Sequence, residues 1–149
     1  MQELINIQAS LKAPKNQRNS FGNYNYRSAE DILEALKPLL KEQNCFLIVT
    51  DELVCTGQRY YIKATATITK EDCSKSVSVS GFAREEEVKK GMDSSQITGA
   101  CSSYARKYAL NGLFLIDDNK DSDSTNTHGK DETSTPKQAN FNPKKDLSF

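Results

Sequence analysis

Apolar side chains recur at helical spacing in two parts of the N-terminal third of the chain. Residues 2–12 carry them on one face, which predicts a short amphipathic helix ending before Pro14. Residues 29–40 repeat the pattern, and Ser28 with the acidic first turn after it is a typical helix start. Between the two, residues 15–27 are polar and basic with interspersed aromatic rings. We predict a loop there.

The period then changes to that of β-structure. Residues 45–54 are β-branched and apolar, and residues 75–84 alternate between valine and serine. Residues 58–69 alternate most clearly, because Ile62, Ala64, Ala66 and Ile68 fall on one face and Arg59, Tyr61, Lys63, Thr65 and Thr67 on the other. Three such segments joined by short polar turns predict an antiparallel meander with one solvated face.

A longer helical pattern follows the strands. Asp93 or Ser94 can cap the helix, and Gly112 is expected to end it. Arg106 and Lys107 lie off its apolar stripe. We predict that this stripe consists of Ile97, Ala100, Cys101, Tyr104 and Tyr108.

These elements predict an α+β fold. Its core is a three-stranded antiparallel β-meander followed by a helix packed on the sheet, with N-terminal helices before it. The 149 residues fit one domain, which we assign to residues 1–117. Residues 118–149 are rich in Asp, Ser, Thr, Asn and Lys and have no apolar period, so we expect a disordered polar tail.

Composition excludes few functions. The 20 basic and 20 acidic side chains cancel, and residues 1–116 retain 15 bases against 13 acids, which is only mildly positive. The four cysteines have no C-x-x-C spacing and are expected to be reduced, packed thiols of a cytosolic protein. The sequence has neither a leader pattern nor an apolar run that could cross a bilayer, so we expect a soluble protein that stays where it is made.

Enzyme motifs are missing from the sequence. It has no phosphate-binding G-x-x-x-x-G-K loop, no H-E-x-x-H and no G-x-S-x-G, and its single histidine lies in the polar tail. A metal-dependent nuclease could still be built from carboxylates, with Asp51, Glu52, Asp72 and Asp93 as candidates. Nothing in the spacing indicates that these acids converge. We therefore expect no catalysis, no metal and no cofactor.

Two groups of residues could contact a nucleic acid. The solvated face of the second strand carries Arg59, Tyr61 and Lys63, which offer charge for phosphates and a ring for base stacking. The same pattern is common on ordinary wet faces, and Arg106 and Lys107 of the late helix have the same ambiguity.

The aromatic and basic loop has two interpretations as well. Its members Phe21, Tyr24, Tyr26 and Arg27 could stack bases and hold phosphates. Aromatic side chains in a loop more often anchor it to the protein's own core. The sequence leaves both alternatives open.

The late helix carries a longer motif. It contains Gln96 and Thr98-Gly99, then Ser-Tyr-Ala-Arg-Lys-Tyr at residues 103–108, Leu113-Phe114 and the acids of residues 117–123. This stretch resembles the signature of the ERF family, the phage "essential recombination function" proteins. Residues 21–27, with Asp31-Ile32 and residues 37–40, are similar to the family's opening segment, so the resemblance covers roughly residues 1–123.

The resemblance implies an ATP-independent protein that coats single-stranded DNA, assembles into rings or helical filaments as a homo-oligomer, and anneals complementary strands during phage recombination in the host cytoplasm. It also implies a fold related to the eukaryotic Rad-type annealing proteins, with DNA in a positive groove. The signature transfers that role to Arg106 and Lys107. Arg59, Tyr61, Lys63 and Arg27 are added from their chemistry alone. A passive single-strand binding protein, a metal-dependent nuclease and an interaction protein remain the alternatives.

Two further hypotheses concern packing and the tail. The small residues Thr98, Gly99 and Ala100 could let the helix approach the sheet, and we interpret Gly99 and Tyr104 as packing positions. The chain ends in Asp146-Leu147-Ser148-Phe149, which resembles the C-terminal tip with which bacterial single-strand binding proteins dock their partners. The tail is therefore a candidate contact for host single-strand binding protein or its partners.

Overall fold

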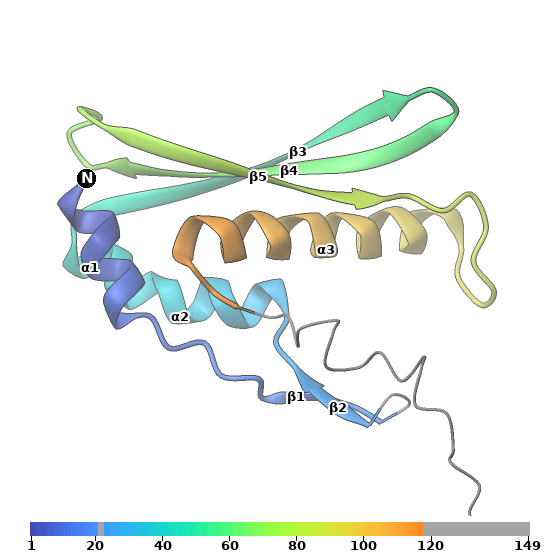
Figure 1. Ribbon diagram of the computed structural model, residues 1–149, viewed down its shortest axis with the longest axis horizontal. Coiled ribbons are helices and arrows are strands. Elements are labelled where there is room, and N and C mark those ends of the chain that lie inside the picture. The colour runs from blue at the N-terminus through green and yellow to red at the C-terminus, as the bar shows by residue number, and fades with distance from the viewer. Residues whose placement is uncertain (21–22, 118–149) are drawn as a thin grey trace, which may run out of the picture. The chain divides into compact units, whose positions relative to one another are not determined.

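The N-terminal third combines two helices with a short hairpin. In this computed structural model, which describes residues 1–20 and 23–117, α1 spans Gln2–Ser10 and α2 spans Ala29–Glu42. Between them β1 (Gln17–Asn19) pairs antiparallel with β2 (Tyr24–Tyr26) (Figure 1). The predicted loop is therefore a small two-stranded sheet. Backbone pairing between these polar residues has no hydrophobic alternation to reveal it.

Helix α2 begins where its sequence predicts. The Ser28 hydroxyl accepts a hydrogen bond from the Asp31 backbone N–H, and the Asp31 carboxylate accepts one from the Ser28 backbone N–H. This reciprocal capping satisfies two donors that a helix start otherwise leaves without partners. It also fixes the chain direction immediately after Arg27.

The main sheet is a three-stranded meander. β3 (Cys45–Thr56), β4 (Arg59–Lys70) and β5 (Ser76–Arg84) pair antiparallel in the order β3-β4-β5. Gly57, at φ +63°, makes the tight turn between β3 and β4. The alternation in β4 is confirmed, because Ile62, Ala64, Ala66 and Ile68 are all buried.

The opposite face of this sheet carries hydroxyl groups. Thr65 bonds to Ser80, and Thr67 to Ser78, each at 2.8 Å between side-chain oxygens of β4 and β5. Figure 1 shows the helices gathered on the other side of the sheet. The predicted solvated face is thus confirmed, and Arg59, Tyr61 and Lys63 lie on it by their register.

Helix α3 spans Ser94–Phe114 and lies along the sheet against β4 and β5 (Figure 1). Asp93 is its N-cap, in a reciprocal pair with Gln96. The prediction that Gly112 ends the helix was wrong. The helix continues to Phe114 and closes on Leu115 in the left-handed conformation, at φ +55°. Gly112 lies against Val79 of β5, where an added Cβ would come within 2.9 Å of Val79 Cγ1.

The backbone of α3 comes close to the backbone of β5 at Gly81. A Cβ placed there would lie 2.5 Å from the Ala109 nitrogen and 2.6 Å from the Ala105 carbonyl oxygen. Across the sheet, Gly81 is paired with Ala64 of β4. Small residues on both partners therefore bring helix and sheet into direct contact, as close packing of a protein interior requires.

This contact corrects the predicted helix stripe. Ile97 and Cys101 are buried as expected, but Ala105 and Ala109 complete the stripe in place of two tyrosines. Tyr104 and Tyr108 are 52% and 46% exposed, because the helix lies too close to the sheet for a ring to fit between them.

The packing interpretation of Gly99 and Tyr104 was also wrong. A Cβ on Gly99 would meet nothing within 4 Å. The close approach belongs to Gly81 on the facing strand.

Beyond this seam, the end of α3 joins a second part of the core. Leu110, Leu113 and Phe114 are buried together with Ile7 of α1 and with Ile32 and Leu36 of α2. All belong to one hydrophobic cluster. α1, α2 and the end of α3 therefore fold as one unit with the sheet.

The four cysteines differ in how far their thiols are buried. Cys101 is buried, and burial raises the pKa of its thiol. Cys45 is half-buried. The expectation of packed thiols was wrong for Cys55, beside the β3–β4 turn, and for Cys73, in the β4–β5 turn, since both are exposed.

Candidate nucleic-acid interface

The six residues predicted to contact DNA lie in separate places. Arg59, Tyr61 and Lys63 are on the face of β4 turned away from α3, where Lys63 pairs with Glu52 of β3 at 3.3 Å. The α3 and hairpin residues lie on the helical side of the sheet (Figure 1). In the described part of the chain, the strand cations and the helix cations therefore do not form one flat site.

Arg106 is held by an acid of the sheet. Its Nε lies 3.0 Å from both carboxylate oxygens of Asp51 on β3, and its terminal Nη2 lies 2.8 Å from one of them. The Ser102 hydroxyl, one turn earlier on α3, donates to the same carboxylate at 2.5 Å. This clasp joins the middle of α3 to the edge strand β3 of the sheet.

The clasp sets the ionisation of both partners. Partial burial raises the pKa of Asp51, but the hydrogen bonds from Arg106 and Ser102 outweigh it and hold this pKa below its ordinary 3.8. The pKa of Arg106 is raised, chiefly by its hydrogen bond to Asp51. Near neutral pH the pair is fully ionised.

Lys107 has different surroundings, because two tyrosines of α3 lie beside it. Its ammonium lies 5.4 Å from the ring centre of Tyr104 and 5.9 Å from that of Tyr108. The two rings are 6.2 Å apart and tilted by 37°. Since both rings are about half exposed, this is a surface cluster of one cation and two aromatic rings.

A hollow of about 380 Å³ lies between this side of α3 and the β1–β2 hairpin. Tyr104 and Lys107 line it from α3, while Tyr24, Tyr26 and Arg27 line it from the hairpin and the residue that follows. We call it the tyrosine hollow. Of the described residues that line it, none is acidic. It therefore combines positive charge with exposed aromatic surface.

The hairpin presents its rings to solvent. Tyr24 and Tyr26 are 51% and 38% exposed and stand edge to face, with ring centres 6.3 Å apart. The alternative that these tyrosines anchor a loop to the core is thus wrong. Arg27 donates a hydrogen bond to the backbone carbonyl of Asp117 at 3.4 Å. Phe21, predicted with them, lies outside the described residues.

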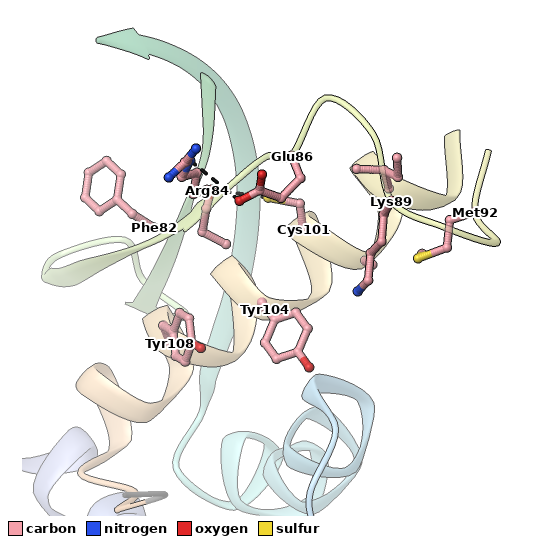
Figure 2. A pocket seen from close by; sticks show the side chains of 11 residues that line it. Phe82, Arg84, Glu86, Lys89, Met92, Cys101, Tyr104 and Tyr108 are labelled. Carbon is pink, nitrogen blue, oxygen red and sulfur yellow. Dashed lines mark hydrogen bonds and ion pairs between the residues drawn. The ribbon is translucent and has the colours of Figure 1, made fainter. Parts of the chain in front are cut away.

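A second hollow, of about 360 Å³, lies on the β5 side of α3 (Figure 2). Figure 2 shows Phe82 and Arg84 on β5, Lys89 and Met92 on the connection before α3, and Tyr104 and Tyr108 projecting from the helix. Tyr104 and Ala100 line both hollows. We call this one the edge hollow. It includes Glu86, which pairs with Arg84 at 3.7 Å.

Tyr104 and Tyr108 were missed as surface residues because the sequence places them at the spacing of a buried stripe. A signal was present in the order Tyr-x-x-Lys-Tyr, where positions i, i+3 and i+4 share one side of a helix. An aromatic pair with a lysine between them indicates a solvated cluster as readily as a core position.

Within the described residues, no three His, Cys, Asp or Glu side chains come together as metal ligands. The nuclease candidates Asp51, Glu52, Asp72 and Asp93 accordingly form no such group there. None of the described helices has the length and hydropathy needed to span a membrane. The predicted tail, residues 118–149, lies outside the described residues, as does its tip.

Comparison with known proteins adds a family. A sequence model of the ERF superfamily matches residues 1–147. A protein of Salmonella phage P22 named "Essential recombination function protein" is 60% identical over 141 residues, which cover 94% of this chain and 66% of that protein. No solved structure is significantly similar to the chain.

Proposed function

Because the chain belongs to the ERF superfamily, we propose that it binds single-stranded DNA and anneals complementary strands during phage recombination. A recombination role follows from the family and from the name of the P22 relative. The family and this name do not extend to DNA binding, strand annealing or assembly, which are our proposal.

One observation carries the proposal of DNA binding. On α3, Lys107 lies beside two exposed tyrosine rings, and the adjoining tyrosine hollow adds Arg27 with no acid among its described lining residues. Cations neutralise phosphates, and aromatic rings stack on bases whatever their sequence. A protein that anneals any pair of complementary strands needs this sequence-independent chemistry.

Annealing needs no covalent step. It requires many weak contacts that hold a strand extended and release it once it has paired. We therefore propose a non-enzymatic protein that works without nucleotide, metal or other cofactor. We further propose that it forms a homo-oligomer, a ring or a helical filament, because repeated sites raise the modest affinity of one nearly neutral protomer.

Two other features support the same function. The order of three antiparallel strands followed by a helix on one face agrees with that expected of the Rad-type annealing proteins, and we propose a common architecture. Arg59, Tyr61 and Lys63 form a second candidate DNA surface on the opposite side of the sheet. It could hold DNA only as a contact separate from the tyrosine hollow.

The setting of the proposed activity follows from the family. We propose that the protein acts in the host cytoplasm, on phage or prophage DNA. We also propose that its tip at Asp146–Phe149 contacts host single-strand binding protein or that protein's partners. Deleting residues 147–149 should then abolish such a contact and leave annealing intact.

The direct test uses two complementary labelled oligonucleotides, mixed with the full-length protein in a chelator and without nucleotide. We expect duplex to form much faster than in the absence of protein. Binding to each strand without faster pairing would favour a passive single-strand binding protein. Cleavage that depends on magnesium would favour a nuclease. Absence of binding to either strand at low salt would refute both DNA-binding readings.

A further inference from the structure

The tyrosine hollow has features that phosphate binding alone does not explain. Its two cations are accompanied by three exposed tyrosines, Tyr24, Tyr26 and Tyr104. Phosphates need donors and positive charge, whereas exposed rings in a concave surface offer stacking area. The volume of about 380 Å³ falls within the roughly 300–1,000 Å³ usual for small-ligand sites.

We infer that the tyrosine hollow is a nucleobase subsite, in which a base of the bound strand turns toward the protein and stacks on Tyr104 while Lys107 and Arg27 hold the adjoining phosphates. This inference rests on the proposed single-strand binding and names where and how one nucleotide is held. In the bound strand, one base would then be covered by the protein while the neighbouring bases stay open for pairing.

Tyr104 is the best platform for the base because of its position. It extends from a helix that is packed on the sheet at the next residue, Ala105, against Gly81. Its ring lines both hollows, so a strand can continue from the hairpin side toward β5 across it. Tyr24 and Tyr26 face the same space from the hairpin and can close over the base.

Lys107 does not block the ring. At 5.4 Å from the ring centre its ammonium makes a weak contact, worth roughly 0.5–1 kcal/mol at exposed sites. The lysine stem is flexible, so the charge can move from the ring to a phosphate when a base arrives. In the bound state, the Tyr104 ring would then contact the base and the Lys107 ammonium would contact a phosphate.

The edge hollow is the weaker candidate for the same role. Glu86 lines it and pairs with Arg84, so a negative charge faces any phosphate entering there. The tyrosine hollow has no such acid among its described lining residues. Among the described residues, charge therefore favours the hairpin side of α3 for the nucleotide, with the β5 side as a continuation of its path.

The chain contains no tryptophan, so Tyr104→Trp in the full-length protein provides a single fluorescent reporter at the subsite. We expect its emission to fall on addition of oligothymidylate, because a stacked base quenches the indole. The same backbone carrying abasic sites should bind more weakly and quench little. Equal quenching by both strands, or none by either, would overturn the inference.

Affinities separate stacking from charge. Tyr104→Ala should weaken binding of oligothymidylate about tenfold without changing its salt dependence, and Tyr104→Phe should retain it. Lys107→Gln should instead reduce the slope of log affinity against log salt by about 0.7. Since Tyr104 is half exposed, the alanine variant should unfold at the wild-type denaturant concentration.

The two proposals fail in different ways. If Tyr104→Ala binds as tightly as the wild type while Lys107→Gln binds more weakly, the subsite is wrong and single-strand binding stands. If wild-type protein binds no single strand at low salt, the proposed function itself is wrong. Loss of binding in both Tyr104→Ala and Tyr104→Phe would assign the effect to the hydroxyl and would also contradict stacking.

Discussion

Helix α3 has one set of small residues that pack on the sheet and another set of large residues that are exposed to solvent. Toward the sheet, Ala105 and Ala109 lie in backbone contact with Gly81, and nothing larger fits between them. Outside this contact, Tyr104, Lys107 and Tyr108 form an exposed cluster of two rings and one charge, and Tyr104 and Lys107 of this cluster line the tyrosine hollow. The small residues fix the helix, and the fixed helix presents the large ones. One helix can therefore combine residues that pack against the sheet with exposed residues that are available for binding.

The largest expected effect comes from breaking the packed side. Gly81→Ala places a methyl group 2.5 Å from the Ala109 nitrogen and 2.6 Å from the Ala105 oxygen, both backbone atoms that cannot turn away. We expect a loss of about 3 kcal/mol in the free energy of unfolding, measured by urea denaturation. Wild-type stability in this variant would show that α3 does not lie on the sheet as described.

The next effect separates the two candidate DNA surfaces. Arg27→Gln with Lys107→Gln should weaken single-strand binding about tenfold or more and lower the salt slope by about 1.4. Its matched control is Arg59→Gln with Lys63→Gln on the other side of the sheet. We expect a smaller loss there, because Glu52 already offsets Lys63. A larger loss in the control would move the binding site to β4.

The clasp between α3 and β3 should give a moderate effect on stability. Asp51→Asn removes the charge that Arg106 contacts, and we expect a loss of about 1 kcal/mol at neutral pH for this partly exposed pair. Urea denaturation of both proteins across the pH range measures it.

The pH dependence has a defined sign. The folded-state pKa of Asp51 lies below its ordinary 3.8, so its stabilisation is complete above that value and is lost as the pH falls through the folded pKa. The difference between wild type and Asp51→Asn should therefore shrink in acid. A difference that grew as the pH fell would contradict the clasp.

The smallest effect should be a gain. Gly99 lies inside α3 with nothing within 4 Å of an added Cβ, so Gly99→Ala should raise the free energy of unfolding by roughly 0.5–1 kcal/mol. Thermal denaturation compares it directly with Gly81→Ala. If both glycine variants were destabilised alike, the assignment of the close contact to Gly81 and of open space to Gly99 would fail.

The sequence predicted the fold well where periodicity carries it. The alternation of β4 and the capping residues Ser28 and Asp93 were confirmed because burial and hydrogen bonding at these places are local to the segment. The β1–β2 hairpin was missed because polar strands of three residues have no such period.

The sequence predicted only part of the candidate site. The periodicity of α3 does not show that Gly81, on a different segment of the chain, brings the helix too close to the sheet for Tyr104 and Tyr108 to be buried. Nor can it tell that Asp51 contacts Arg106 across the α3–β3 boundary. Both facts arise from tertiary contacts between segments distant in sequence. The sequence predicted Lys107 and Arg27 as DNA-contacting residues, and in the structure both line the tyrosine hollow.

The most direct test of the account is to locate the DNA. Single-stranded oligonucleotide can be cross-linked by ultraviolet light to the full-length protein and the modified peptides identified by mass spectrometry. We expect the cross-links on the peptides that carry Tyr104 and the β1–β2 hairpin, since their rings line the tyrosine hollow. Cross-links confined to Tyr61 and its neighbours on the outer face of β4 would contradict the account.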